Sequence, residues 1–404
     1  MKFLRVALPF LAVLILLPLL VFSVRARNQV QAVQQLKPSA SRPAAEARLV
    51  SGLAALPASD LPAKAHPKLE SSLVQLVEAF EREGALEAAS LAKGTGIELR
   101  GDSIRAIIEV EPGRVEDAAR VAKQLGGVFE GSTDNLVQVM MPVSSLEELA
   151  SREEVRYVRQ PIRFLPLAVG SEGVGVSGVP SWRSAGLTGA GVKVAVVDFG
   201  FTGYGSLLGT ELPSQVVARS FRSDGRMELP EEGDQGRHGT GCAEIVYDMA
   251  PGAQLYLITF DTEVELAKAV DWLITEGINI VSFSIGSPPW GLADVSGLLG
   301  DVVAKAADAG ILWVNAAGNL AMQHWSGPWS EATVDGWLDF APGSPLNGLF
   351  AAAGDTMIVS LRWDDPFDGS CNDYDLFILD PVLLLYGVSL YSSENPQDCS
   401  TPPR

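Results

Sequence analysis

Apolar and polar positions follow two different rhythms along the chain. Between residues 104 and 159, short apolar stretches alternate with stretches of helical spacing. This pattern predicts strands at 104–110, 128–129, 136–141 and 155–158, and helices at 115–125 and 144–150. The second helix opens with Ser144-Ser145-Leu146-Glu147, the spacing of a capping box. The order βαββαβ predicts a ferredoxin-like split unit, a fold that hosts many functions.

From residue 192 strands and helices alternate one by one. The predicted strands are KVAVVD, QLYLITF, NIVSFS and ILWVN. The predicted helices are one carrying His238, one that opens with a capping box at 262–265 and ends at Gly277, and one over 294–309. The alternation indicates an α/β fold with a doubly wound parallel sheet, in which ligands bind beyond the carboxyl ends of the strands.

Flanking segments complete the organisation. Residues 28–66 are rich in Ala, Pro and Gln and are interpreted as a tether, and Leu69, Leu73, Leu76, Val77 and Phe80 then share one face of a predicted helix. The Gly- and Val-rich residues 166–180 are expected to form an exposed linker. Beyond residue 320, apolar strands are predicted at 354–365 and 374–380, separated by acidic loops.

The N-terminus indicates export. Lys2 and Arg5 precede an unbroken apolar run over residues 6–22, which is either a cleaved signal peptide or a retained membrane anchor. The formal net charge of -19 argues against nucleic acid as a partner. Outside the cytoplasm disulfides persist, so Cys371 and Cys399 are able to pair, unless all three cysteines are free thiols.

Three chemically capable residues fall at or near the predicted sheet edge. Asp198 ends an apolar strand and can orient an imidazole, although it could equally cap a turn. His238, one of only three histidines, starts a helix among small residues and can act as a general base or lie on the surface. Asn319 can donate its amide to an oxyanion or occupy a left-handed loop position. Their combination in this order favours a catalytic site.

These segments resemble the subtilisin-like serine proteases, the subtilases. The matching stretches are KVAVVDFGF around Asp198, RHGTGCAEIVYDMAPGA around His238, SFSIG at 282–286 and VNAAGN ending at Asn319. The resemblance implies that Asp198 is the orienting aspartate, His238 the general base and Asn319 the oxyanion donor. It also implies a strand edge that pairs with the substrate backbone, formed by Ser284, Ile285 and Gly286. The ferredoxin-like unit resembles the family's prodomain, whose tail near residues 160–175 would lie in the cleft; a retained accessory domain is the alternative.

The family's nucleophile lies in a G-T-S segment, which does not occur in these 404 residues. The C-terminal residues resemble the β-sandwich insertions that some bacterial subtilases carry before that serine. We therefore expect either a fragment that stops before the serine, which we favour, or a degenerate homologue, and no serine-route hydrolysis by these residues alone. Cys242, four residues after His238, is expected to be a small buried residue and not a substitute nucleophile.

The resulting domain prediction is 1–27 signal or anchor, 28–66 tether, 67–100 helical segment, 101–165 ferredoxin-like prodomain, 166–180 linker, 181–324 subtilisin-like catalytic domain and 325–404 β-sandwich-like insertion.

No cofactor is required. Ca²⁺ could bind the acidic loop at 364–375, although a solvated turn is the better interpretation. The expected function is an exported serine endopeptidase made as a proenzyme, with peptide substrates and its own prodomain as partners. The alternatives are a pseudoprotease that binds extended peptides and an extracellular adhesion module.

Overall fold

The computed structural model describes residues 19–26, 66–95, 97–162, 165–166, 173–229, 235–286, 297–319, 324–331, 336–350, 358–365, 371–379 and 391–393. The chain divides into two compact units. The first consists of Met1–Ala63, Gly327–Val359 and Tyr374–Ser393. The second consists of Lys64–Ser326, Ser360–Asp373 and Glu394–Arg404, and it contains every predicted catalytic residue.

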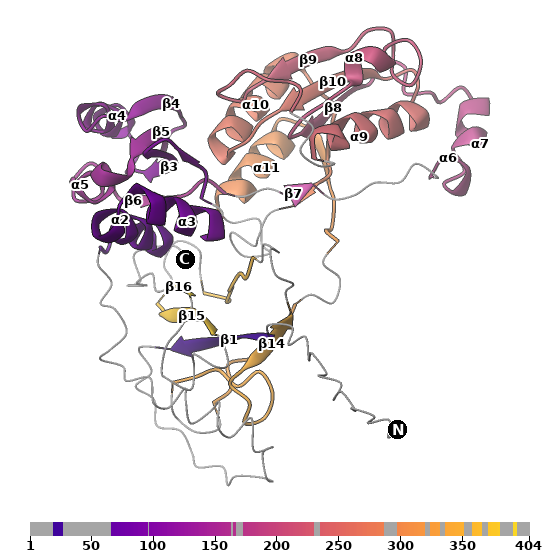
Figure 1. Cartoon of the computed structure of the whole chain (residues 1–404). Coiled ribbons are helices and arrows are strands. Elements are labelled where there is room, and N and C mark those ends of the chain that lie inside the picture. The colour runs from indigo at the N-terminus through magenta and orange to yellow at the C-terminus, as the bar shows by residue number, and fades with distance from the viewer. Residues whose placement is uncertain are drawn as a thin grey trace, which may run out of the picture. The chain divides into compact units, whose positions relative to one another are not determined.

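One part of the second unit is built on a five-stranded parallel sheet, whose strands β8, β9 and β10 are labelled in Figure 1. Its strand order is β13-β11-β8-β10-β9, and all four neighbouring pairs are parallel. The strands are β8 (Lys193–Asp198), β9 (Val217–Ser220), β10 (Gln254–Thr259), β11 (Ile280–Phe283) and β13 (Leu312–Asn315). The predicted parallel α/β sheet is therefore confirmed.

Helices cover both faces of this sheet because its strands alternate apolar side chains between the two faces. Ala195 and Val197 of β8 pack in one cluster with α10 (Glu263–Glu276) and α11 (Leu298–Asp308). Val194 and Val196 pack in the other cluster, together with α9 (Gln235–Met249). A short helix, α8 (Tyr204–Leu207), lies on the same side as α9.

A second, antiparallel sheet belongs to residues 97–159. Its strands are β2 (Leu99–Arg100), β3 (Ser103–Glu109), β4 (Val128–Ser132), β5 (Leu136–Pro142) and β6 (Tyr157–Arg159). The order along the sheet is β2-β3-β5-β4, with β6 also paired to β3, and every pair is antiparallel. Strand β5 therefore lies between β3 and β4, which α4 (Val115–Gln124) connects.

One face of this sheet packs on helices and the other on the parallel-sheet part. The first face forms a core with α2 (Ser71–Glu83), α3 (Ala85–Thr95), α4 and α5 (Leu146–Ala150), which includes Leu73 and Leu76 of the predicted amphipathic stripe. On the other face, Ile107 and Leu136 pack against Val264 of α10. The two five-stranded sheets of the second unit are thus joined through α10.

The two predicted capping boxes have different outcomes. At Thr262 the box is complete, since the Thr262 side chain accepts from the Glu265 N–H and the Glu265 side chain accepts from the Thr262 N–H. The predicted box at Ser144 is wrong. A 3-10 turn, η1 (Val143–Ser145), leads directly into α5, so Ser145 is the N-cap residue and makes no side-chain cap bond.

Residues 165–184 contain more regular structure than a linker. They include β7 (Leu165–Pro166) and two short helices, α6 (Gly173–Val176) and α7 (Val179–Ser184). Strand β7 pairs antiparallel with β12 (Ile285–Gly286), with Leu165 opposite Gly286 and Pro166 opposite Ile285. The predicted exposed linker over 166–180 thus contains short helices, whose residues are mostly exposed, and its role as a linker stays a prediction.

The first unit contains one four-stranded antiparallel sheet, β14-β1-β15-β16. Its strands are β1 (Leu19–Ala26), β14 (Asn347–Phe350), β15 (Tyr374–Leu379) and β16 (Tyr391–Ser393). Strand β15 lies where a strand is predicted. The strand predicted over 354–365 is wrong for residues 358–365, which are irregular where the structure describes them. A β-sandwich in this region stays a prediction.

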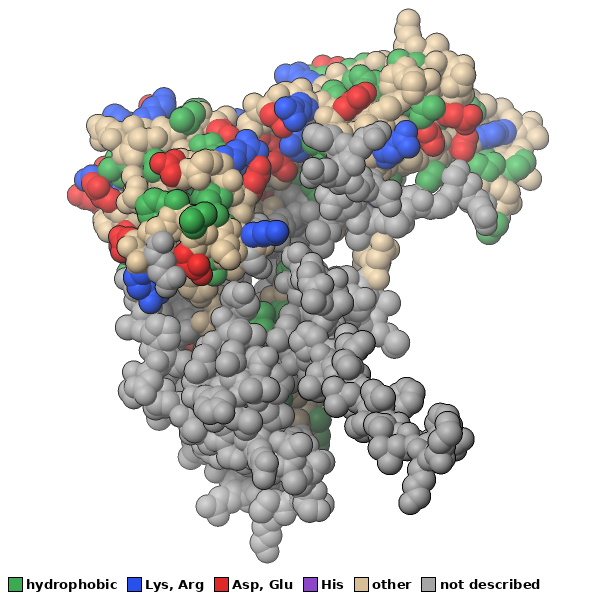
Figure 2. All heavy atoms as spheres, in the orientation of Figure 1, with side chains coloured by type: hydrophobic (Ala, Val, Ile, Leu, Met, Phe, Trp, Pro, Cys, Tyr) green, Lys and Arg blue, Asp and Glu red, His purple; other side chains and the backbone are tan. Residues whose placement is uncertain are grey.

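The predicted apolar run at residues 6–22 lies mostly outside the described residues, and its last four residues are in β1. Within the described ranges, no helix combines the length and the apolar character needed to cross a membrane. On the face of the molecule in Figure 2, acidic and basic side chains are interspersed over the described surface and do not gather by sign.

Candidate active site

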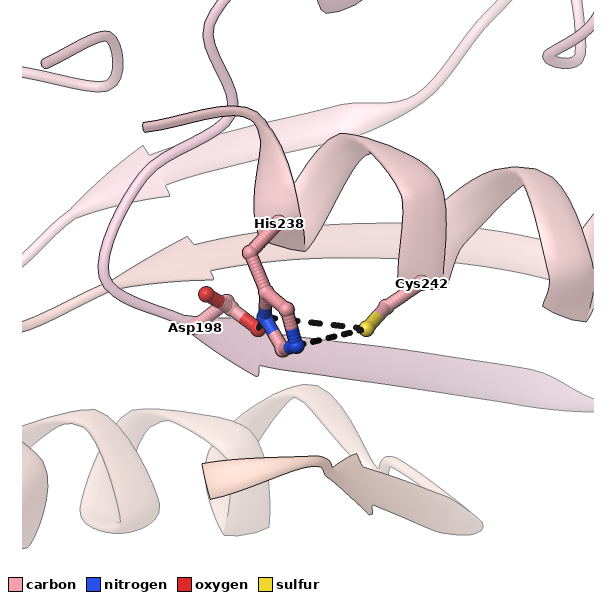
Figure 3. Close-up of side chains that lie close together, drawn as sticks. All are labelled: Asp198, His238 and Cys242. Carbon is pink, nitrogen blue, oxygen red and sulfur yellow. Dashed lines mark hydrogen bonds and ion pairs between the residues drawn. The ribbon is translucent and has the colours of Figure 1, made fainter. Parts of the chain in front are cut away.

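Asp198 and His238 meet at the carboxyl end of the central strand β8. Asp198 is its last residue and is completely buried, because β8 has neighbours on both sides and helices on both faces. His238 Nδ1 lies 2.7 Å from Asp198 Oδ2 (Figure 3). The other carboxylate oxygen, Oδ1, accepts the Phe199 N–H at 2.8 Å, so the carboxylate is held in place from both ends.

The small residues around His238 allow its helix to approach β8 closely. A Cβ at Gly239 would lie 2.6 Å from the Gly200 carbonyl oxygen and 2.7 Å from Asp198 Cβ, which is closer than atoms can pack. The next residue, Thr240, is also tied to this side of the site, since its hydroxyl donates to the Thr202 carbonyl at 3.1 Å. Glycine at 239 is therefore required for the imidazole to reach the carboxylate.

The electrostatic environment suits a base that becomes charged during a reaction. Burial raises the pKa of Asp198, and the hydrogen bond and charge of His238 together with the Phe199 N–H offset only part of that rise. A buried carboxylate of this kind gains most when the neighbouring imidazole takes up a proton. With Asp198 ionised, Nδ1 of His238 carries the hydrogen and Nε2 is left to accept a proton.

Cys242 lies one helical turn beyond His238 and belongs to the core. Its thiol is free and only 4% exposed, and it packs with Ala243 and the β8 side chains of the same cluster. Its sulfur is 3.8 Å from Nδ1 and 3.9 Å from Nε2 of His238. These nearly equal distances show that the sulfur does not lie along the lone pair of either nitrogen, so the expectation of a small buried cysteine is confirmed.

Asp198, His238 and Cys242 are also the one group of His, Cys and acidic side chains with metal-ligand spacing in the described part of the chain. Their ligand atoms lie within 4.8 Å of one another. The 2.7 Å contact is, however, the length of a hydrogen bond between Nδ1 and the carboxylate. We therefore interpret these side chains as an orienting pair beside a core thiol.

The remaining predicted site residues follow other strands of the same sheet. Ser284 comes directly after β11, and Ile285 and Gly286 form β12, which already pairs with β7. Asn319 lies in an exposed bend four residues beyond the end of β13, after Gly318, which has a φ of 92°. Because the sheet is parallel, β8, β11 and β13 all end at the edge where Asp198 meets His238.

The acidic loop predicted as a possible Ca²⁺ site is described only in part. Asp365 Oδ2 accepts the N–H groups of Cys371 and Asn372, and Oδ1 accepts the Asn372 amide at 2.6 Å. This carboxylate is thus already used to hold the turn. Cys371 is disulfide-bonded, while its predicted partner, Cys399, lies outside the described residues.

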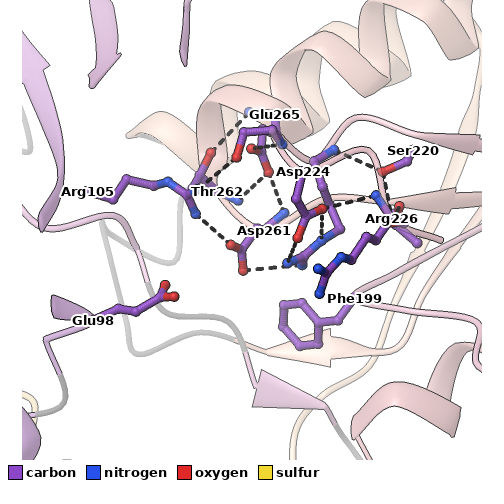
Figure 4. Close-up of polar contacts among 12 residues, drawn as sticks. Glu98, Arg105, Phe199, Ser220, Asp224, Arg226, Asp261, Thr262 and Glu265 are labelled. Atoms are coloured by element: carbon purple, nitrogen blue, oxygen red, sulfur yellow. Dashed lines mark hydrogen bonds and ion pairs between the residues drawn. The ribbon is translucent and has the colours of Figure 1, made fainter. Parts of the chain in front are cut away.

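A buried polar network between the antiparallel sheet and the start of α10, which includes Arg105, Asp261 and Glu265, was not predicted from the sequence (Figure 4). Arg105 of β3, whose side chain is 6% exposed, donates to Glu130 Oε2 at 2.7 Å, Asp261 Oδ2 at 2.8 Å and the Ser223 hydroxyl at 2.7 Å. Gln138 of β5 donates to Glu265 Oε1 at 3.3 Å. An arginine inside the apolar stretch IRAIIEV was the one signal that could have indicated such an interface.

Comparison with known proteins identifies the part of the chain that contains this geometry. Residues 189–337 match the family model described as "Subtilase family", and this stretch contains Asp198, His238 and Asn319. The chain carries a subtilase domain. The subtilase match begins after the antiparallel sheet and ends within the first unit.

Individual subtilases are similar to parts of the chain. The minor extracellular protease Epr of Bacillus subtilis (strain 168) is 30% identical in an alignment of 155 residues that covers 34% of this chain and 21% of Epr. An alkaline protease of Alkalihalobacillus alcalophilus is 26% identical over 206 residues, 48% of this chain and 51% of that protein. Subtilisin Savinase of Lederbergia lenta is 30% identical over 152 residues, 35% of this chain and 52% of that protein. The chain thus spans between about a fifth and about half of the length of these relatives.

Proposed function

We propose that this chain is the precursor of an exported subtilisin-like serine endopeptidase in which Asp198 orients His238 as the general base. The observation that carries this proposal is the 2.7 Å contact between His238 Nδ1 and the buried Asp198 carboxylate, at the edge of a parallel sheet. The subtilase match over the same residues supports it. Epr, to which part of the chain is similar, is named an extracellular protease, and this supports a location outside the cytoplasm.

The residues present would contribute to acyl transfer in four ways. Nε2 of His238 would take the proton of a serine hydroxyl as its oxygen attacks the scissile carbonyl, and would then give that proton to the leaving amine. Asp198 would stabilise the imidazolium formed between these steps. The Asn319 amide would donate to the oxyanion, and Ile285–Gly286 would pair with the backbone of an extended substrate.

The serine is the one component of this triad that the proposal takes from outside the 404 residues. Cys242 is not proposed to replace it, because its thiol is buried and lies against the imidazole. We therefore assign the thiol no role as a nucleophile.

The antiparallel unit over residues 97–159 is proposed to be a ferredoxin-like prodomain. Two contacts support this role: its sheet packs on α10 through Ile107 and Leu136, and the chain that follows it pairs as β7 with the proposed substrate edge, β12. A segment in that position blocks the edge against other peptides. Processing within residues 167–184 would release it.

The pairing of β7 with β12 also supports a second function, binding of extended peptides without hydrolysis. This function needs the edge and the sheet, but it needs neither a nucleophile nor the general base. The two functions differ in whether the complete reading frame supplies a reactive serine.

A test is to express the complete reading frame and measure casein hydrolysis and labelling by a fluorophosphonate. His238→Ala is expected to abolish both, and Asn319→Ala to lower kcat by about 10²–10³-fold, the magnitude measured for such a donor in this family. His324→Ala is the matched control, since His324 is an exposed histidine to which we assign no role, and it should retain activity. Unlabelled protein that still binds extended peptides would establish the second function in place of the first.

A further inference from the structure

Glu263, the first residue of α10, makes two contacts with the N-terminal part of the second unit. Its Oε1 accepts from Arg159 Nη1 at 2.6 Å, and its Oε2 accepts the backbone N–H of Ile162 at 3.1 Å. The side chains of Glu263 and Arg159 are 2% and 3% exposed. One buried carboxylate therefore contacts both the last strand of the antiparallel sheet and the chain segment that leaves it.

The departing segment is held at further points before it reaches β7. The Gln160 N–H donates to Glu70 Oε2 at 2.6 Å, where Glu70 is the N-cap residue of α2. The side chain of Ile162 is 1% exposed and packs in the core cluster of the parallel sheet with Phe283 and Ile285. Ile162 is thus anchored to the subtilase domain by its side chain and to Glu263 by its backbone.

Only two residues separate Ile162 from Leu165, so the position of Ile162 limits where β7 can lie along β12. An extended chain advances about 3.3 Å per residue, and a shift by one residue would turn every side chain to the opposite face. We propose that Glu263 is a positioning residue that fastens β7 to β12 and so keeps this stretch of the chain on the substrate-binding edge. This inference rests on the proposed function only in assigning that edge to substrate.

The test compares two isosteric variants of the same helical turn in the full chain. Glu263→Gln removes the charge and replaces one carboxylate oxygen with an NH2 donor, so the side chain can no longer accept from both Arg159 and the Ile162 N–H. Glu265→Gln is the matched control, because Glu265 is also a buried carboxylate (3% exposed) that contacts the antiparallel sheet through Gln138. The Glu265 carboxylate accepts hydrogen bonds from Gln138, Ser223, Asp261 and Thr262, none of which lies in the segment from Arg159 to Pro166.

Hydrogen exchange followed by mass spectrometry would be read in peptides that contain Leu165, the Ile285–Gly286 edge and β3. Losing a hydrogen bond to a charged group corresponds to at least about tenfold in a local opening equilibrium, so Glu263→Gln should speed exchange at Leu165 and at Ile285–Gly286 by about tenfold. Exchange in β3 should stay within about twofold of the parent, and Glu265→Gln should leave the β7 and β12 peptides unchanged.

Equal acceleration by the two variants at β7 and β12, or none by Glu263→Gln, would overturn the proposal. If β3 exchange shows that Glu263→Gln unfolds the sheet, Glu263→Asp replaces it as the variant. The shorter carboxylate keeps the charge beside Arg159 but withdraws from the Ile162 N–H, so it should still open β7 alone. The result does not depend on hydrolysis, so its failure would leave the protease assay unaffected and a failed protease assay would leave this result standing.

Discussion

Two glycines in the first turns of α9 provide a sharp test of why small residues surround His238. Gly239 faces Asp198 and the Gly200 carbonyl, whereas a Cβ at Gly241 would meet no atom within 4 Å. Both positions are helical and only two residues apart. Replacing each by alanine therefore adds the same methyl group to the same helix in two different surroundings.

The expected effects have opposite signs. Alanine is favoured over glycine in a helix by about 1 kcal/mol, so Gly241→Ala should raise the free energy of unfolding by up to that amount. At Gly239 the same gain is opposed by overpacking, which costs typically about 1–3 kcal/mol. The Cβ would lie 2.6 Å from a backbone oxygen and 2.7 Å from Asp198 Cβ, which places the cost at the upper end. We expect Gly239→Ala to be about 2–3 kcal/mol less stable than Gly241→Ala.

Urea denaturation of the full chain, followed by far-ultraviolet circular dichroism, measures this difference from the shift in the midpoint at a constant m-value. The parent protein is the reference for both variants. If Gly239→Ala is as stable as Gly241→Ala, the close approach of α9 to β8 is not what requires glycine, and the derivation of the site from packing is refuted.

Three further predictions follow from the buried polar groups. Arg159→Met should cost about 3–5 kcal/mol of stability because it leaves Glu263 charged and buried, and adding Glu263→Gln should recover much of that loss; additive effects in urea titrations would contradict the pairing. Burial and the charge of Asp261 raise the pKa of Glu265, so the folded state holds that proton more tightly than the unfolded state. The free energy of unfolding should then fall as pH rises from the ordinary value of 4.5 through the raised pKa, and Glu265→Gln should remove this loss, as unfolding measured across that pH window would show. Cys242→Ala should leave hydrolysis by the complete protein within about threefold of the parent, because the thiol is a core group; a complete loss of hydrolysis would give the thiol a catalytic role.

The helices and strands of the second unit are largely predictable from the sequence. The strand KVAVVD coincides with β8, and the helix predicted to end at Gly277 ends there because Gly277 takes a left-handed conformation with a φ of 67°. Strand patterns and helix ends of this kind depend on a few adjacent residues and can therefore be predicted from the sequence. The capping box predicted at Ser144 shows where such local patterns fail. A 3-10 turn precedes α5, so Ser144 lies within that turn and is not the N-cap residue of the helix.

The candidate site could be predicted where a residue capable of catalysis lies at the carboxyl end of a predicted strand or at the start of the helix that follows. Asp198 and His238 are 40 residues apart, and their contact follows from the parallel sheet that the apolar rhythm predicts. Glu263 could not be assigned in this way. Its partners, Arg159 and Ile162, lie about a hundred residues away, and only the packing of the antiparallel sheet on α10 brings them together.

The most direct test of the account is the effect of Asp198→Asn on hydrolysis by the product of the complete reading frame. Asparagine keeps the shape of the side chain but cannot stabilise an imidazolium or hold the required tautomer of His238. We expect kcat to fall by about 10⁴-fold while circular dichroism shows an intact fold. Activity within tenfold of the parent would contradict the assignment of Asp198 and His238 as the catalytic pair.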